Sequence, residues 1–127
     1  IWEKCVKLPK GVILLNSEKA IANEGSSMHH CIYTNYCGHL KNKRMIAFHV
    51  TNEDGDFTCS FFLWNNQIEF DQAHKAWNKR LTDSEMQFAK SLEKYVAELV
   101  SLNPIEQKKQ TESQLFHLDD LDDLELF

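Results

Sequence analysis

Several features are absent from this 127-residue chain, and each absence narrows the class of protein. No run of eighteen apolar residues occurs, so the sequence predicts no transmembrane helix. No basic segment followed by an apolar one stands at its start, so no secretory signal peptide is visible. We therefore expect a soluble cytoplasmic protein. Because the sequence begins at Ile1 rather than at a methionine, we also expect a fragment of a longer chain.

Cysteine pairs with the spacing of about two to four residues that structural zinc sites use are also missing. Cys31, Cys37 and His39 come closest to a zinc pattern. On a helix, however, Cys31 and Cys37 point in different directions and cannot hold one ion. The sequence thus predicts no metal and no cofactor. With no sign of export, we expect the four cysteines to be free thiols.

Basic residues are missing from the C-terminal part of the chain. Residues 110–127 hold six acidic residues and no Lys or Arg, whereas residues 1–109 hold 14 basic and 13 acidic residues. A nearly neutral body gives little electrostatic drive for tight nonspecific DNA binding. We divide the chain into one domain, residues 1–103, and a polar linker with an acidic, hydrophobic tail, residues 104–127.

The middle of the chain has the period of β-strands. Segments 44–51, 56–64 and 67–74 are rich in β-branched and aromatic residues and are separated by "NEDG" and "NN", which are typical hairpin turns. They predict a three-stranded antiparallel meander, and residues 11–17 predict an edge or entry strand. Strict alternation along the last strand places Gln72 on the same apolar face as Phe70. A glutamine there must be hydrogen-bonded or functional.

Helix signals flank the meander on both sides. Ser17 is a predicted N-cap of a helix that ends at Gly25, and a second helix is predicted from Ser26 or Ser27 to Gly38. After the meander, residues 82–102 predict the main core helix, which begins with the capping box formed by Thr82 and Glu85. The expected fold is therefore α+β: a short antiparallel meander packed against helices, with an acidic C-terminal tail.

One set of spaced residues resembles a known family. The pattern is "EG-x-x-M/L-x-H-C" entering a helix, a Tyr shortly after, a Thr in a hairpin, and "Q-x-x-x-x-x-N". The matching residues are Glu24, Gly25, Met28, His30, Cys31, Tyr36, Thr58, Gln72 and Asn78. In this order they resemble the PcfJ-like proteins of conjugative plasmids, phages and other mobile elements. Two positions depart from the pattern: Lys75 stands where the family often has glycine, and His49 where it often has arginine.

The resemblance implies a setting rather than a reaction. It implies a mobile-element domain that often sits at the C-terminal side of a longer protein. Our leading hypothesis is accordingly a protein-interaction or nucleic-acid-associated module in DNA transfer, replication or host conflict.

A small hydrolase or transferase centred on Cys31 is the alternative hypothesis. Near a helix N-terminus the thiol pKa falls, which favours a thiolate nucleophile. His30, Gln72 and Asn78 then complete the candidate catalytic set, with His74 as a further source of orientation. In the competing interpretation Cys31 packs as a small hydrophobe, and the polar residues pin the fold or bind a ligand.

Candidate binding residues surround the end of the last predicted strand. Trp77 stands in the loop "AHKAWNKR" beside His74 and Lys75, and could offer a stacking surface to single-stranded nucleic acid. Tyr36 joins this set through the family pattern. Core packing explains Phe61 and Phe62 more simply than such a surface.

The tail "QLFHLDDLDDLELF" is the last candidate site. Its Leu124, Leu126 and Phe127 stand among acidic residues, a pattern that suits a peptide docking into an apolar groove with a basic rim. Short stretches of it resemble peptides that bind the bacterial sliding clamp and the docking tails of single-stranded DNA binding proteins. The expected partner is thus a host protein or one encoded by the element. An amphipathic helix that packs back on its own domain is the alternative.

Overall fold

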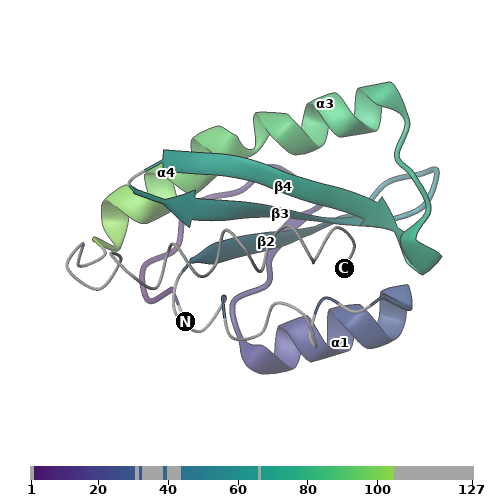
Figure 1. The fold of residues 1–127 in the computed structure, drawn as a ribbon, viewed down its shortest axis with the longest axis horizontal. Helices are drawn as coiled ribbons and strands as arrows, with labels where there is room; N and C mark the ends of the chain where they lie inside the picture. The colour runs from purple at the N-terminus through teal and green to yellow at the C-terminus, as the bar shows by residue number, and fades with distance from the viewer. Residues whose placement is uncertain (1, 31, 33–38, 40–43, 66, 105–127) are drawn as a thin grey trace.

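The computed structural model describes residues 2–30, 32, 39, 44–65 and 67–104. Its strands are β1 (Val12–Leu14), β2 (Met45–Val50), β3 (Phe57–Trp64) and β4 (Gln67–Lys75); its helices are α1 (Glu18–Met28), the short 3-10 helix η1 (Ala76–Asn78), α3 (Asp83–Ser91) and α4 (Glu93–Leu102). The strands form one antiparallel sheet in the order β1-β2-β3-β4. α1 lies on one face of this sheet, and α3 and α4 lie on the other (Figure 1). The α+β class is confirmed, and the sheet holds four strands: the predicted meander and, at its edge, β1, which lies within the strand predicted at residues 11–17.

Alternation along β2 and β3 builds a core on each face of the sheet. The larger core lies under α3 and α4, and its buried side chains include Phe48, Phe57, Phe61, Leu92 and Val96. The smaller core lies under α1 and contains Leu15, Ile21, Ile32, Met45, Ala47 and Phe62. Each large apolar side chain that is fully buried contributes about 1.5–3 kcal/mol. The apolar core under α1 uses only part of that face, which leaves the rest of the face to polar residues.

The hairpin between β2 and β3 turns where the sequence predicts. Gly55 has a φ of 113°, a conformation that a side chain at this position would strain, and its N–H donates to the carbonyl of Asn52. The carboxylate of Asp56 in turn accepts a hydrogen bond from the Asn52 N–H at 3.1 Å. The hairpin turn predicted from "NEDG" is confirmed.

A β-bulge interrupts the pairing of β3 with β4. Ser60 pairs with Gln72, but the next residue, Phe61, pairs with Phe70, which leaves Asp71 as an extra residue on β4. One extra residue shifts the alternation, so all side chains beyond it change face. The prediction that Gln72 shares the apolar face of Phe70 is therefore wrong. Gln72 lies on the α1 face, beside Ser60.

The helices differ from the prediction at two points. α1 begins at the predicted N-cap Ser17 but passes through Gly25 and ends at His29, which adopts a left-handed conformation. The predicted stop at Gly25 is wrong. The second helix is predicted to run to Gly38, and after Met28 the structure describes only His29, His30 and Ile32 of it. The predicted core helix 82–102 begins with its capping box as expected but is divided into α3 and α4 at Leu92.

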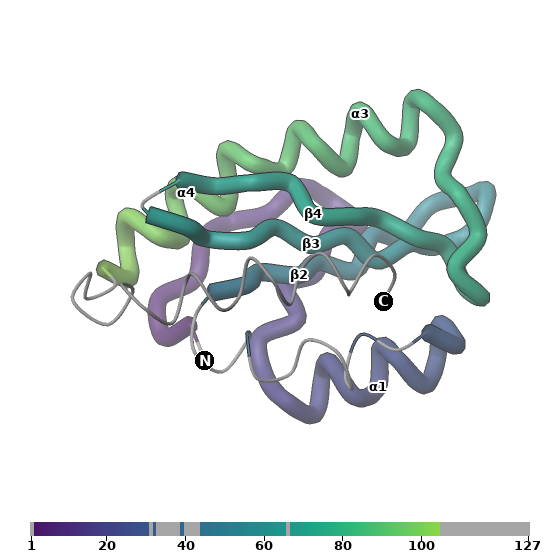
Figure 2. The backbone as a smooth tube through the Cα atoms, viewed as in Figure 1, coloured from purple at the N-terminus to yellow at the C-terminus, as the bar shows by residue number. Residues whose placement is uncertain are grey.

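The C-terminal end of α1 lies beside η1, which follows β4 (Figure 2). Two segments separated by about fifty positions in the sequence thus meet at one edge of the sheet. No helix within the described ranges is long and apolar enough to cross a membrane.

Candidate functional site

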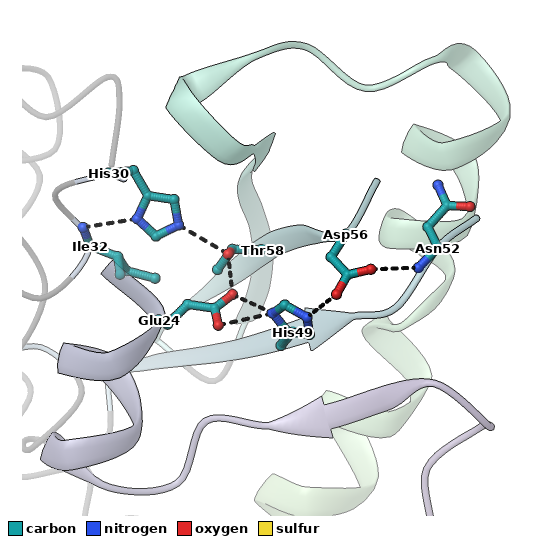
Figure 3. Close-up of polar contacts among 7 residues, drawn as sticks. All are labelled: Glu24, His30, Ile32, His49, Asn52, Asp56 and Thr58. Carbon is teal, nitrogen blue, oxygen red and sulfur yellow. Dashed lines mark hydrogen bonds and ion pairs between the residues drawn. The ribbon is translucent and has the colours of Figure 1, made fainter. Parts of the chain in front are cut away.

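A polar row crosses the sheet on the face that α1 covers. His49 on β2 pairs with Thr58 on β3, and Thr58 pairs with His74 on β4. Residues directly opposite each other in antiparallel strands share a face, so the three side chains lie in line. Glu24 reaches this row from α1, and His30 reaches it from the residues that follow α1 (Figure 3). We call these five residues the polar layer.

His49 lies between two carboxylates. Its Nδ1 is 2.7 Å from Oε2 of Glu24, and its Nε2 is 2.9 Å from Oδ2 of Asp56 (Figure 3). The hydrogen bond with Glu24, aided by Asp56, outweighs burial and raises the pKa of His49 to about 9. At neutral pH the ring is therefore an imidazolium that donates from both nitrogens. It joins α1 to the β2–β3 hairpin.

The hydroxyl of Thr58 lies between Glu24 and His30. It donates to the Glu24 carboxylate, and its oxygen lies 3.0 Å from Nε2 of His30. Because the hydroxyl proton is directed at Glu24, Nε2 of His30 must be the donor in the second bond. Nδ1 of His30 then accepts from the N–H of Ile32 at 3.4 Å. These directions fix one tautomer of a neutral His30.

Such an arrangement does not suit a catalytic base. Burial lowers the pKa of His30, and the nitrogen that would take up a proton faces the Ile32 amide. Thr58 is fully buried, so its hydroxyl offers no accessible nucleophile. The hydrogen bonds of both residues are directed into the protein itself, which is the behaviour of a structural network.

A second chain of hydrogen bonds starts at the bulge. Oδ2 of Asp71 accepts from the Ser60 hydroxyl at 2.9 Å and from the Gln72 amide at 3.4 Å, while Oε1 of Gln72 lies 2.9 Å from Nε2 of His74. Burial raises the pKa of Asp71 to about 6, against the opposing effect of these hydrogen bonds. Burial also lowers the pKa of His74, opposed by a backbone hydrogen bond with Asn78. Gln72 thus links the bulge to the polar layer.

Trp77 and His29 form a parallel stack at the edge of this region. Their ring centroids are 4.0 Å apart and their planes differ by 5°. Trp77 is 66% exposed although it is one of the largest apolar side chains. Both residues, together with Asn78, have left-handed backbone conformations, with φ between 53° and 61°.

Contacts of Lys75 hold the loop that carries Trp77 in place. Nζ of Lys75 lies 3.1 Å from Oε1 of Glu85 on α3 and 3.1 Å from the carbonyl of Asp54. The N–H of Lys75 donates to the carbonyl of Lys79 at 2.8 Å and closes the loop. Lys75, predicted to bind a ligand, is therefore an anchor of this loop. Oδ1 of Asn78 is buried and accepts no hydrogen bond among the described residues.

The predicted catalytic set is brought together only in part. His30 bonds to Thr58, while Gln72 bonds to Asp71 and His74, and the side chain of Asn78 joins neither chain of bonds. Cys31 lies outside the described residues, so the enzyme centred on it stays a prediction. The predicted binding residues Tyr36, Leu124, Leu126 and Phe127, with the whole tail, also lie outside them.

Sequence reasoning missed the centre of the polar layer. Glu24 and Thr58 entered only as parts of a family pattern, and His49 only as a departure from it. Asp56 was not singled out at all. The register of the hairpin contained the needed signal, since pairing around the "NEDG" turn sets His49 opposite Thr58.

Comparison of the chain with protein-family models, with curated proteins and with solved structures finds no match. Within the described residues, no group of three or more His, Cys, Asp and Glu side chains is arranged to hold a metal ion. The class that fold and geometry define is an α+β domain with a buried polar layer and an exposed aromatic stack at its edge.

Proposed function

We propose that this chain is a noncatalytic binding domain of the PcfJ-like type that acts through molecular contacts in DNA transfer, replication or host conflict of a mobile genetic element. In this proposal the polar layer is a scaffold. Its task is to fix the end of α1 against the sheet, so that the surface formed by His29 and η1 keeps one shape.

A single observation carries the proposal: the polar side chains that resemble a catalytic set bond to one another rather than to open space. Thr58 is fully buried, Glu24 accepts from both Thr58 and His49, and the remaining nitrogen of His49 is directed at Asp56. A satisfied buried network rigidifies a fold, whereas a catalytic group must reach a substrate.

The family resemblance gains support from where its residues lie. Glu24, His30 and Thr58 are far apart in sequence, yet hydrogen bonds join them in the polar layer, and Gln72 bonds to His74 of the same layer. The departure at His49 is chemically mild, because its raised pKa supplies the positive charge that an arginine would bring to Glu24.

Replacement of Thr58 tests the scaffold role. Thr58→Val keeps the shape but leaves Glu24 and His30 without their shared partner, so we expect the free energy of unfolding to fall by about 1–3 kcal/mol. Thr58→Ser restores the hydroxyl and should recover most of this loss. The measurement is urea unfolding of the full chain, with Thr51→Val, an exposed threonine after β2, as the matched control.

A catalytic role predicts a different result. Catalytic groups are retained at a cost in stability, so their removal is commonly neutral or stabilising. An unchanged or higher free energy of unfolding for Thr58→Val would therefore contradict the scaffold role.

A further inference from the structure

The aromatic stack at the edge of the sheet has the features of a ligand site. Resting on the binding role proposed above, we infer that Trp77 stacks on a base of single-stranded nucleic acid, with Lys79 and Arg80 meeting the neighbouring phosphates.

His29 covers one face of the Trp77 indole at a centroid distance of 4.0 Å and an interplanar angle of 5°. The residue is nevertheless 66% exposed, so contact with His29 leaves most of its surface uncovered. A base laid on the uncovered part would continue an existing parallel stack. Stacking of this kind tolerates any base, because every base has a flat π surface.

The backbone conformation supports a role for the exposed ring. Trp77 has a φ of 61°, and its stacking partner His29 has a φ of 53°. Bulky side chains rarely adopt this region, and strain of this kind is concentrated at functional sites. A chain selected for stability alone would place Gly or Asn at these two positions. Trp77 thus combines a strained backbone conformation with an exposed indole, which is the combination expected at a binding site.

The surroundings of Trp77 favour nucleic acid over a protein partner. Protein hot spots are surrounded by other contacts that exclude water, whereas the residues that follow Trp77 are Asn78, Lys79 and Arg80. Lys79 and Arg80 are exposed, unlike Lys75, whose ammonium group is held by Glu85. Two exposed cations that follow an exposed aromatic residue within three positions of the chain match the way single strands are bound, by stacking together with phosphate contacts.

The loop that carries Trp77 is already ordered before a ligand binds, which favours binding even though the body of the chain is nearly neutral. The loop is closed by the bond between the Lys75 N–H and the Lys79 carbonyl and anchored by the ion pair with Glu85. An ordered loop loses little conformational freedom when a ligand binds. For the two described cations Lys79 and Arg80, the dependence on salt should be shallow, with a slope of about −1.4 in log Kobs against log salt for two phosphates on a single strand.

Fluorescence anisotropy with the full chain tests the inference. The probes are fluorescein-labelled single strands of about twelve thymidines or twelve uridines and a DNA duplex of equal length. We expect both single strands to bind and the duplex to bind more weakly. Trp77→Gly should lower the affinity about 5- to 150-fold, as expected for the loss of one stacked base. Trp77→Phe should keep most of the affinity.

The variants are chosen so that unfolding cannot be mistaken for loss of binding. Glycine accepts the left-handed conformation at position 77, so Trp77→Gly should fold with an unchanged or higher melting temperature. The matched control is Phe88→Ala, which removes another exposed aromatic ring, on α3. It should leave the affinity unchanged. Lys79→Ala with Arg80→Ala should flatten the salt dependence.

Binding of neither single strand would overturn the inference, and so would equal binding by the protein with Trp77 and by Trp77→Gly. A partner protein whose binding depends on Trp77, found together with no binding of single strands, would also overturn it. None of these results affects the scaffold test at Thr58, so the two proposals can fail separately.

Discussion

Nδ1 of His49 lies 2.7 Å from Oε2 of Glu24, and this contact joins the second strand of the sheet to the helix that covers it. The same carboxylate accepts the hydroxyl of Thr58, so one buried side chain of α1 is bound to two neighbouring strands. Breaking one partner of such a pair leaves an uncompensated buried charge, which is strongly destabilising. The position of α1, and of His29 at its end, therefore depends on this carboxylate.

The charge of His49 should make stability depend on pH. Its folded pKa of about 9 exceeds the ordinary value of 6.5, so its contribution is fully present below about pH 6.5 and is lost as pH rises through about 9. We expect the loss to be on the order of 2–3 kcal/mol. The measurement is the difference in free energy of unfolding between the protein and His49→Gln across this range. A difference that stays constant from pH 6.5 to pH 9.5 would contradict the assigned charge.

Asp71 should also make the protein less stable as pH rises, but for a different reason: ionisation of this buried carboxyl is disfavoured in the fold. Its folded pKa of about 6 exceeds the ordinary value of 3.8, so stability is lost as pH rises from about 4 to about 6. Asp71→Asn removes this charge while keeping an acceptor for Ser60. We expect the variant to be more stable at pH 7 by about 1–3 kcal/mol and equal near pH 3.5.

Urea unfolding at the two pH values measures this effect. Asp54→Asn, in the exposed hairpin turn, is the matched control and should change stability by less than about 0.5 kcal/mol at either pH. If Asp71→Asn is less stable at pH 7, then ionisation of Asp71 is not disfavoured in the fold as described above.

Much of the fold can be predicted from local signals in the sequence. Alternating residues fix β2, β3 and β4, the "NEDG" turn fixes their hairpin, and Thr82 with Glu85 fixes the start of α3. Each of these features depends on neighbours within a few positions. Their energies are local, so the pattern alone determines them.

The rest depends on contacts that local patterns do not contain. The bulge at Asp71 moves Gln72 to the other face, and strict alternation cannot anticipate one extra residue. Gly25 is a typical helix stop, yet α1 continues through it to Met28. Both Gly25 and Met28 are buried, so tertiary packing outweighs the local preference of glycine. The sequence pointed to single residues of the candidate site but not to their contacts, because His49 and Thr58 become neighbours only through the register of β2 and β3.

The two described cysteines should react at very different rates. Cys59 is fully buried between the sheet and α3 with α4, and burial raises its pKa, whereas Cys5 is exposed. We expect iodoacetamide at pH 8 to label Cys5 readily and Cys59 only after unfolding, because the thiolate is the reactive form. Peptide mass mapping reads out each site. Rapid labelling of Cys59 in the folded protein would contradict the described core.

A double-mutant cycle between Glu24 and His49 tests the central claim most directly. The measurement is the free energy of unfolding of the protein, Glu24→Gln, His49→Gln and the double variant, at pH 7 and again at pH 10. A structural ion pair predicts a coupling of about 1–3 kcal/mol at pH 7 that becomes small at pH 10, where His49 is neutral. A coupling near zero at pH 7 would mean that this pair does not hold α1 on the sheet.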